Sequence, residues 1–277
     1  MPSPVLLSER AGRLGTLMSR ELNGTGLQRP DETLDELRPM GLRLLQKKDG
    51  YRFSLDPILL CAFATRLPQG EIADLGTGCG IIPLLLAPRA TGRLLGIEIQ
   101  PELADRARRN VLLNGLDERV EILCGDLRQL TERLDSGGFS AVFANPPYRT
   151  PGTGRQAPGA ERAAARHELA GGLPAFVAAA ARLLGHGGCF YIIHLAERLT
   201  EVLTEMRASG LEPKRLRCIH SRLGDPARLV LVEGRKRGRA GLVVESPLMV
   251  YADSGYSAEV LAMYEPSAGS GGEEIGA

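Results

Sequence analysis

The sequence has no apolar run that approaches the ~20 residues of a membrane-spanning helix. The first twenty residues place Arg10, Arg13 and Arg20 between short apolar pieces, so the continuous apolar segment of a secretory signal is missing. We therefore expect a cytoplasmic protein with no membrane partner.

Cysteine is scarce, and its spacing does not suit a metal. The chain has five cysteines, with no Cys-x-x-Cys pair and no Cys/His pattern of a zinc site. An odd number of scattered cysteines is typical of reduced thiols in the cytoplasm, so we expect no bound metal. The formal net charge is only +1, so bulk charge neither favours nor excludes a nucleic-acid partner.

The middle of the chain shows a regular alternation of strand and helix patterns. Strands are predicted near 71–75, 93–98, 119–123, 139–144 and 188–194, and helices near 80–88, 101–113, 127–134 and 169–184. This β-α-β order predicts a parallel sheet covered by helices on both faces. A helix near 197–209 precedes strands near 214–220 and 228–235. Their connection is too short for a crossover helix, so we expect them to pair antiparallel.

The two ends of the chain differ from this middle part. Residues 1–40 mix glycine, proline and charges, and predict a loosely ordered arm with at most one short helix. Residues 266–277 are rich in Gly, Ser and Glu and predict a disordered tail. The domain predicted over 41–265 begins with a hairpin at 42–53, because Asp49-Gly50 separates two strand-like runs.

A helix is predicted from Asp56 to Thr65, directly after this hairpin. Asp is a natural N-cap, and proline is tolerated at the first helical position. The sequence Asp56-Pro57 therefore predicts that Asp56 caps the helix.

The first predicted strand runs into a glycine-rich loop, Asp74-Leu75-Gly76-Thr77-Gly78-Cys79-Gly80. Glycines let the backbone approach a ligand closely, and ligands of open α/β sheets bind at the carboxyl ends of the strands. The loop has neither the dinucleotide spacing nor the Gly-Lys-Ser/Thr of a triphosphate site, and Asp74 would repel a pyrophosphate. S-adenosylmethionine, with its amino-acid group and sulfonium, tolerates this acid.

Two more acids follow the next two strands. Glu98 lies about twenty residues past the loop, where a carboxylate commonly binds ribose hydroxyls, and Asp126 could accept the amino hydrogens of the cofactor's adenine. Each has a structural alternative: Asp126 with Gln129 forms a plausible capping box, and Glu98 could be a solvated charge. Three acids at three successive strand ends favour the cofactor interpretation.

The fourth predicted strand runs into Asn145-Pro146-Pro147-Tyr148. The two prolines fix the backbone and expose its carbonyls. Asn145 and the Pro146 carbonyl can accept both hydrogens of a planar amino group, and Tyr148 offers a ring on which a flat base or amide stacks. Correct positioning can lower the activation free energy by ~7–11 kcal/mol. A general base raises the rate by only ~10²–10⁴-fold, which is a smaller effect. The structural alternative is an ordinary proline-rich turn.

These residues resemble the class I S-adenosylmethionine-dependent methyltransferases of the Asn-Pro-Pro-Tyr group, and most closely the bacterial tRNA(Val) adenine-N6 methyltransferase family. The resemblance covers roughly residues 41–252. Its motifs are Gly50 to Asp56, Asp74 to Gly80, Asn145 to Tyr148, Ala165-Arg166-His167-Glu168 and Pro247 to Tyr251. It implies a Rossmann-like α/β fold with a seven-stranded, mostly parallel sheet whose last strand is antiparallel. The arm at 1–40 and the loop at 149–158 depart from the family.

The predicted site follows from these residues and, for Phe53 and Asp56, from the resemblance alone. The catalytic set is Asn145, Pro146, Pro147 and Tyr148. The cofactor set is Phe53, Asp56, Asp74, Gly76, Thr77, Gly78, Gly80, Glu98, Ile99, Asp126, Leu127 and Asn145. The substrate set is Tyr148, Arg149, Arg155, Arg166 and His167.

The predicted substrate is RNA, most specifically tRNA near the anticodon, bound by a monomer. Basic residues follow the catalytic loop and recur between Arg207 and Arg239, although solvated charge explains the second group equally well. A target base must leave its stack, which favours an exposed RNA loop over duplex DNA. Three alternatives remain: a glutamine-N5 protein methyltransferase, an rRNA guanine-N2 methyltransferase, and a catalytically idle RNA-binding module.

Overall fold

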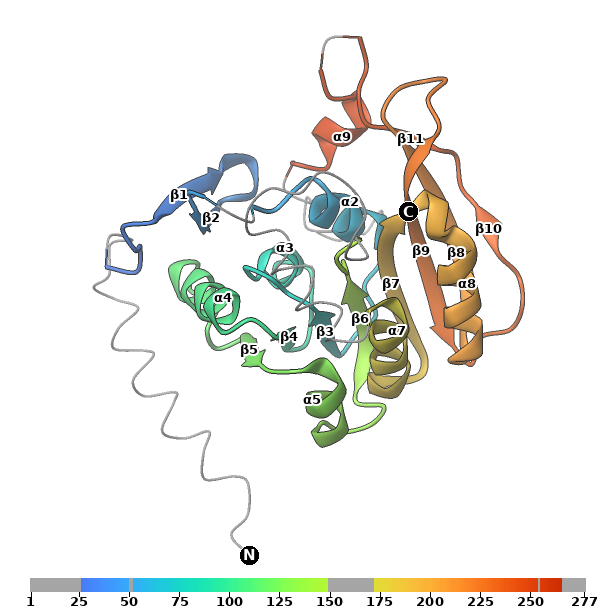
Figure 1. The fold of residues 1–277 in the computed structure, drawn as a ribbon, viewed down its shortest axis with the longest axis horizontal. Coiled ribbons are helices and arrows are strands. Elements are labelled where there is room, and N and C mark those ends of the chain that lie inside the picture. The colour runs from blue at the N-terminus through green and yellow to red at the C-terminus, as the bar shows by residue number, and fades with distance from the viewer. Residues whose placement is uncertain (1–25, 50–51, 149–171, 254, 266–277) are drawn as a thin grey trace, which may run out of the picture.

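The structure is a computed structural model that describes residues 26–49, 52–148, 172–253 and 255–265. A nine-stranded sheet runs through its centre in the order β10-β8-β9-β7-β6-β3-β4-β5, with β11 also paired to β8 (Figure 1). The strands are β3 Glu71–Leu75, β4 Leu94–Glu98, β5 Val120–Cys124, β6 Phe139–Ala144, β7 Leu184–Leu195, β8 Leu211–His220, β9 Ala227–Lys236, β10 Val243–Val244 and β11 Leu248–Met249.

The direction of the strands confirms the predicted fold class. All neighbouring pairs from β5 to β7 are parallel, whereas β9 lies antiparallel between β7 and β8. Strands β3 to β9 are the seven predicted strands, and the last of them is the antiparallel one. The short strands β10 and β11, which the sequence did not predict, extend the sheet beside β8.

Helices cover both faces of the sheet. Helices α2 (Asp56–Phe63), α3 (Ile81–Leu86) and α4 (Pro101–Leu113) pack on one face, and α5 (Leu127–Arg133), α7 (Gly172–Leu183) and α8 (Leu199–Ala208) pack on the other. A short 3-10 turn, η3 (Ala196–Arg198), precedes α8, and the short helix α9 (Ala258–Ala262) follows β11.

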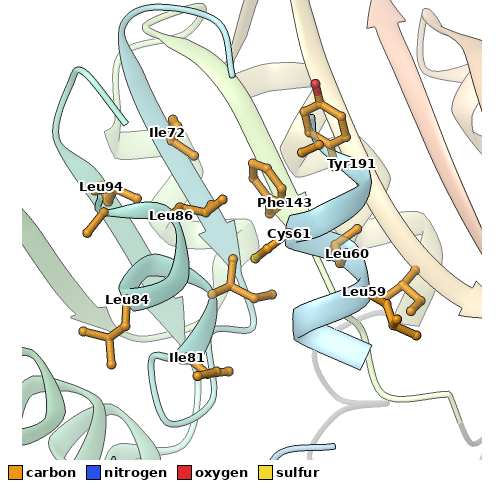
Figure 2. Packing of buried hydrophobic residues seen from close by; sticks show 14 of the residues in the cluster. Leu59, Leu60, Cys61, Ile72, Ile81, Leu84, Leu86, Leu94, Phe143 and Tyr191 are labelled. Carbon is orange, nitrogen blue, oxygen red and sulfur yellow. The ribbon is translucent and has the colours of Figure 1, made fainter. Parts of the chain in front are cut away.

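Side chains that alternate along each strand separate two apolar clusters. In β6, Phe143 belongs to the cluster under α2 to α4, while its neighbours Val142 and Ala144 belong to the cluster under α5 to α8. Figure 2 shows the first cluster, in which Phe143 stacks on Tyr191 of β7 with ring centroids 4.8 Å apart. Both faces of the central strands are thus buried, which holds their carboxyl ends in a fixed arrangement.

The hairpin predicted over 42–53 is wrong. Strand β2 (Leu42–Lys47) pairs antiparallel with β1 (Glu32–Leu37), and Arg52 and Phe53 are not in a strand. The turn is the 3-10 segment η2 (Arg38–Met40), closed by Gly41 at φ 66°. Part of the segment predicted as a loose arm is therefore a strand.

Helix α2 begins at Asp56, as predicted, and ends at Phe63, two residues before the predicted end. Leu55 occupies the cap position and no side chain caps the helix, so the capping role predicted for Asp56 is wrong.

Among the described residues, no helix is both long and apolar enough to cross a lipid bilayer.

Candidate active site

The carboxyl ends of β3, β4 and β6 meet at one edge of the sheet. Leu75, the last residue of β3, pairs with Ile97 on one side and with Ala144 on the other. The residues that follow in each strand or loop, Gly76, Glu98 and Asn145, therefore lie beside one another. The sheet itself brings the glycine loop and the Asn-Pro-Pro-Tyr loop together.

The glycine loop has a backbone that only glycine adopts easily. Gly76, Gly78 and Gly80 have φ angles of 71°, 59° and 86°. A Cβ at Gly76 would lie 3.0 Å from the Phe176 ring, and one at Gly80 would lie 3.2 Å from Ala107 Cβ. The loop is thus fixed in a tight turn.

Glu98 links this loop to the end of β4. Its side chain is buried, and its carboxylate accepts hydrogen bonds from the backbone N–H groups of Gly78 and Gln100, both at 2.9 Å. Burial raises the pKa of Glu98, while backbone N–H groups, including that of Ile99, oppose the shift. The predicted cofactor residues Gly78, Glu98 and Ile99 are thereby in direct contact.

Asp74 lies in β3, directly before the same loop, and has no hydrogen-bond partner among the described residues. It is 2% exposed, and neither carboxylate oxygen has a partner of normal geometry among the described residues; the same holds for Thr77 Oγ1. Burial raises the pKa of Asp74 to about 8; the neighbouring Thr77 hydroxyl opposes this, and the charge of Glu98 adds to it. Buried polar groups are normally paired, so these oxygens fit a ligand that brings its own donors.

Asp126, unlike Asp74, has hydrogen-bond partners among the described residues. Its carboxylate caps α5 by accepting from the backbone N–H of Arg128 at 2.9 Å, and it also forms an ion pair with the Arg128 guanidinium. The hydrogen bond from Arg128 lowers the pKa of Asp126. Asp126 therefore caps α5, through the Arg128 N–H and not through the N–H of Gln129 that a capping box uses. Its contact with adenine, like that of the buried Leu127 beside it, stays a prediction.

The structure brings three separate elements together around Tyr148. Its hydroxyl lies 2.8 Å from Asp56 Oδ2 on α2 and 2.9 Å from Asn145 Oδ1 in its own loop. Its ring meets the His194 ring edge-on, with centroids 5.5 Å apart. Pro146 and Pro147 lie between the two polar side chains of the loop.

His194 lies near the end of β7, where the sequence predicted a strand over 188–194, and 1% of its surface is exposed. Its contact with Tyr148 was missed, although it stands at the end of the strand next to β6. The Leu195 N–H donates to His194 Nδ1 at 2.9 Å, and burial lowers the pKa of His194 to about 4. The ring is neutral at pH 7, with its proton on Nε2.

Asn110 of α4 was also missed. Its Oδ1 accepts from the Leu45 N–H at 2.7 Å, and its Nδ2 donates to the Cys79 carbonyl at 2.9 Å. This fully buried amide connects β2 to the glycine loop. Phe53, which the family resemblance places near the cofactor, is held by the same strand, because its N–H donates to Gln46 Oε1 at 3.0 Å.

The other predicted substrate residues, Arg149, Arg155, Arg166 and His167, lie outside the described residues. Four of the ten basic residues between Arg207 and Arg239 form ion pairs with described acids. The pairs are Arg207 with Glu212, Arg215 with Glu233 and Glu245, Arg217 with Glu259, and Arg235 with Glu233. These arginines therefore contribute less to a field for phosphates than their number suggests.

Comparison with known proteins gives consistent results. The family described as Methyltransferase domain matches residues 72–157. A relative from Phocaeicola vulgatus named tRNA1(Val) (adenine(37)-N6)-methyltransferase is 30% identical over 177 residues, covering 64% of this chain and 74% of the relative. A relative of the same name from Porphyromonas gingivalis is 30% identical over 227 residues, covering 78% and 88%.

Solved structures share the fold. The predicted O-methyltransferase Atu636 of Agrobacterium tumefaciens superposes with a TM-score of 0.61 at 22% identity, covering 75% of this chain and 94% of its own. TYW2 of P. horikoshii, solved in complex with MeSAdo, has a TM-score of 0.53 at 12% identity, with 76% and 73% covered.

Proposed function

Because the chain belongs to the family of the relatives named tRNA1(Val) (adenine(37)-N6)-methyltransferase, we propose that it methylates N6 of an adenine in RNA, at position 37 of a tRNA. The chain is an S-adenosylmethionine-dependent methyltransferase that acts on an amine nitrogen. The proposal concerns the base and the RNA that it modifies.

The adjacency of β3 and β6 carries this proposal. Leu75 and Ala144 are paired, so the glycine loop and Asn145 begin at the same level of neighbouring strands. A donor bound along the ends of β3 and β4 therefore lies next to an acceptor held at the end of β6. No described histidine or lysine is needed between them, because the nitrogen can lose its proton after the new bond forms.

The described residues fit S-adenosylmethionine. The unpartnered oxygens of Asp74 and Thr77 would accept from its amino group, and the buried carboxylate of Glu98 would hold its ribose hydroxyls. When bound, S-adenosylmethionine supplies a methyl group on a positively charged sulfur. The glycine loop supplies the close backbone approach that the amino-acid end requires.

Asn145 and the following proline would hold the target amine. The Asn145 amide oxygen and the Pro146 carbonyl accept the two amino hydrogens, which favours the pyramidal form of the nitrogen and directs its lone pair toward the methyl carbon. Held in this way, the nitrogen would take the methyl group that the bound cofactor supplies, and its surplus proton would leave to water without a basic side chain. Positioning of this kind supplies ~7–11 kcal/mol. Stacking on the Tyr148 ring, ~1–3 kcal/mol, offsets part of the cost of removing the base from its stack.

The same edge of the sheet offers a surface for RNA beyond the site. His194 pairs with Val230, Val230 pairs with Cys218, and β11 pairs with the end of β8, so the edge continues for three strands, or roughly 15 Å. There the Arg222 guanidinium lies 5.5 Å over the Tyr251 ring, which stacks on Tyr256. Both tyrosines are exposed by about two fifths. Arginine and aromatic rings are the groups on which unpaired bases stack.

The glutamine-N5 alternative has less support. A planar side-chain amide would suit the same loop, but such enzymes are expected to carry a helical domain before the glycine loop. The described residues from 32 to 47 instead form the β1–β2 hairpin. The buried Asp74, whose oxygens have no partner among the described residues, argues against an idle module, because an unused buried carboxylate destabilises a fold.

A labelling experiment tests the proposal. The purified protein is incubated with methyl-labelled S-adenosylmethionine and, in parallel, with total RNA, DNA or protein, and the modified residue is identified by mass spectrometry. We expect N6-methyladenosine in tRNA. Label in glutamine would support the protein-directed alternative, label in N2-methylguanosine the rRNA alternative, and absence of label despite cofactor binding the idle module.

A further inference from the structure

We propose that Asp56 is a positioning residue that draws the Tyr148 hydroxyl away from Asn145, so that the Asn145 amide oxygen is free for the target amine. The proposal rests on the proposed function, since it concerns the same acceptor atom. It assigns Asp56 a role other than the helix cap or cofactor contact expected from the sequence.

The conflict lies in the number of protons. A tyrosine hydroxyl has one hydrogen to donate, yet two acceptors lie within reach of it, Asp56 Oδ2 at 2.8 Å and Asn145 Oδ1 at 2.9 Å. When that hydrogen points to Asn145, the amide oxygen is engaged by the enzyme itself. The target amine needs the same oxygen, so the hydroxyl competes directly with the substrate.

Asp56 resolves this competition because a carboxylate is the stronger acceptor. Charge-assisted hydrogen bonds are roughly twice as strong as neutral ones. Asp56 therefore takes the hydrogen when a substrate amine approaches Asn145. It is well placed to do so, since it is the first residue of α2 and its side chain caps no backbone group there.

A second contact holds the Tyr148 ring while its hydroxyl is held by Asp56. The His194 ring meets it edge-on at 5.5 Å, and His194 is itself fixed by the hydrogen bond from the Leu195 N–H. The ring is thus held from α2 and from β7.

A double-mutant cycle tests this role. Wild type, Asp56→Ala, Tyr148→Phe and the double variant are compared by kcat, by KM for RNA and by the Kd of S-adenosylmethionine from calorimetry. With Asp56 absent, the hydroxyl can donate only to Asn145 of the two, so kcat should fall about 10- to 100-fold with the cofactor Kd unchanged. Tyr148→Phe removes the competing hydroxyl, so Asp56→Ala should have almost no effect in the Phe background.

Two further variants keep the test specific. Asp56→Asn retains an oxygen that accepts from the hydroxyl and should fall between wild type and Asp56→Ala. Glu102→Ala removes an exposed acid from the first turn of α4 and should leave kcat unchanged. An equal loss from Asp56→Ala in the Tyr and Phe backgrounds, or a weakened cofactor Kd in both, would overturn the role.

Failure of the proposed function is distinguishable from failure of this role. If wild type transfers no label to RNA, the substrate proposal is wrong. The cycle is then measured with whichever amine acceptor the labelling experiment identifies, and its non-additivity decides the role of Asp56 independently of the RNA.

Discussion

At the scale of single residues, three carboxylates near the glycine loop have three different environments. Glu98 receives backbone hydrogen bonds, Asp126 is paired with Arg128, and Asp74 has no partner among the described residues. The charge of Asp74 is therefore the least compensated of the three. The other buried side-chain atoms without a partner among the described residues are Thr77 Oγ1 and His194 Nε2. We therefore propose that Asp74 bonds to the cofactor.

The pH dependence of stability should show this uncompensated charge. The pKa of Asp74 is raised by burial from 3.8 to about 8, so the native state binds more protons than the unfolded chain between these values. Its contribution to stability is full below about pH 4 and is lost as the pH rises through about 8. Asp74→Asn cannot ionise, so above pH 8 its unliganded form should have a higher Tm than wild type, by about 2–4 °C for each kcal/mol.

Calorimetric melting curves of both proteins from pH 4 to pH 9 measure this difference. The same variant should lose most of the thermal stabilisation that S-adenosylmethionine gives to wild type. Equal melting temperatures at pH 9, or unchanged stabilisation by the cofactor, would show that Asp74 is neither strained nor in contact with it.

Asn145→Ala should separate chemistry from cofactor binding. The substitution removes the oxygen that would accept one hydrogen of the amine, so kcat should fall about 10²–10³-fold, as when one positioned polar group is lost from an active site. The Kd of S-adenosylmethionine should stay within about twofold of wild type. Steady-state kinetics and calorimetry give both values, and near-normal turnover would exclude Asn145 as the amine acceptor.

At the scale of elements, the β1–β2 hairpin is an unexpected part of the site. Its buried Glu32 forms ion pairs with Arg106 and Arg109 of α4. Burial raises the pKa of Glu32, but the hydrogen bonds to its carboxylate outweigh this effect and lower the pKa to about 2. Asn110 then connects strand β2 with the Cys79 carbonyl. The hairpin thus supports the glycine loop through Asn110 of α4.

Asn110→Ala should weaken cofactor binding more than it lowers the stability of the fold. Loss of the bond to Cys79 frees one carbonyl of the glycine loop, and we expect the Kd of S-adenosylmethionine to rise about tenfold, the effect of one hydrogen bond. Asn114→Ala is the matched control, because Asn114 bonds to Arg43 on the same strand and not to the loop. A similar rise in Kd for both variants would mean that the hairpin acts only through stability.

At the scale of the whole molecule, the sheet and the site edge could be predicted because β-α-β alternation and strand-end motifs are local signals. The β1 strand could not, because its charges resemble a loop until Glu32 and Glu36 are seen opposite Lys47 and Arg43. The contact of Asp56 with Tyr148 joins residues 92 positions apart, a separation for which sequence spacing gives no signal. The features that could not be predicted are thus contacts between residues that come together only in the folded chain.

RNA binding across the molecule should depend on the aromatic surface at the far end of the same edge. Arg222→Ala together with Tyr251→Ala should raise KM for RNA about 10-fold or more, since stacking on one aromatic ring is worth ~1–3 kcal/mol. The kcat and the cofactor Kd should not change. A control pair near the other end of the paired strands β8 and β9, Arg207→Ala of α8 with Lys236→Ala of β9, should have little effect on KM. Equal effects of both pairs would mean that RNA follows general charge.

The crystal structure of the protein with S-adenosylhomocysteine is the most direct test of the shared edge of β3 and β6. We expect the amino group beside Asp74, the ribose hydroxyls on Glu98 and the sulfur facing Asn145. A product molecule bound away from the glycine loop, or one whose sulfur points away from Asn145, would contradict the account.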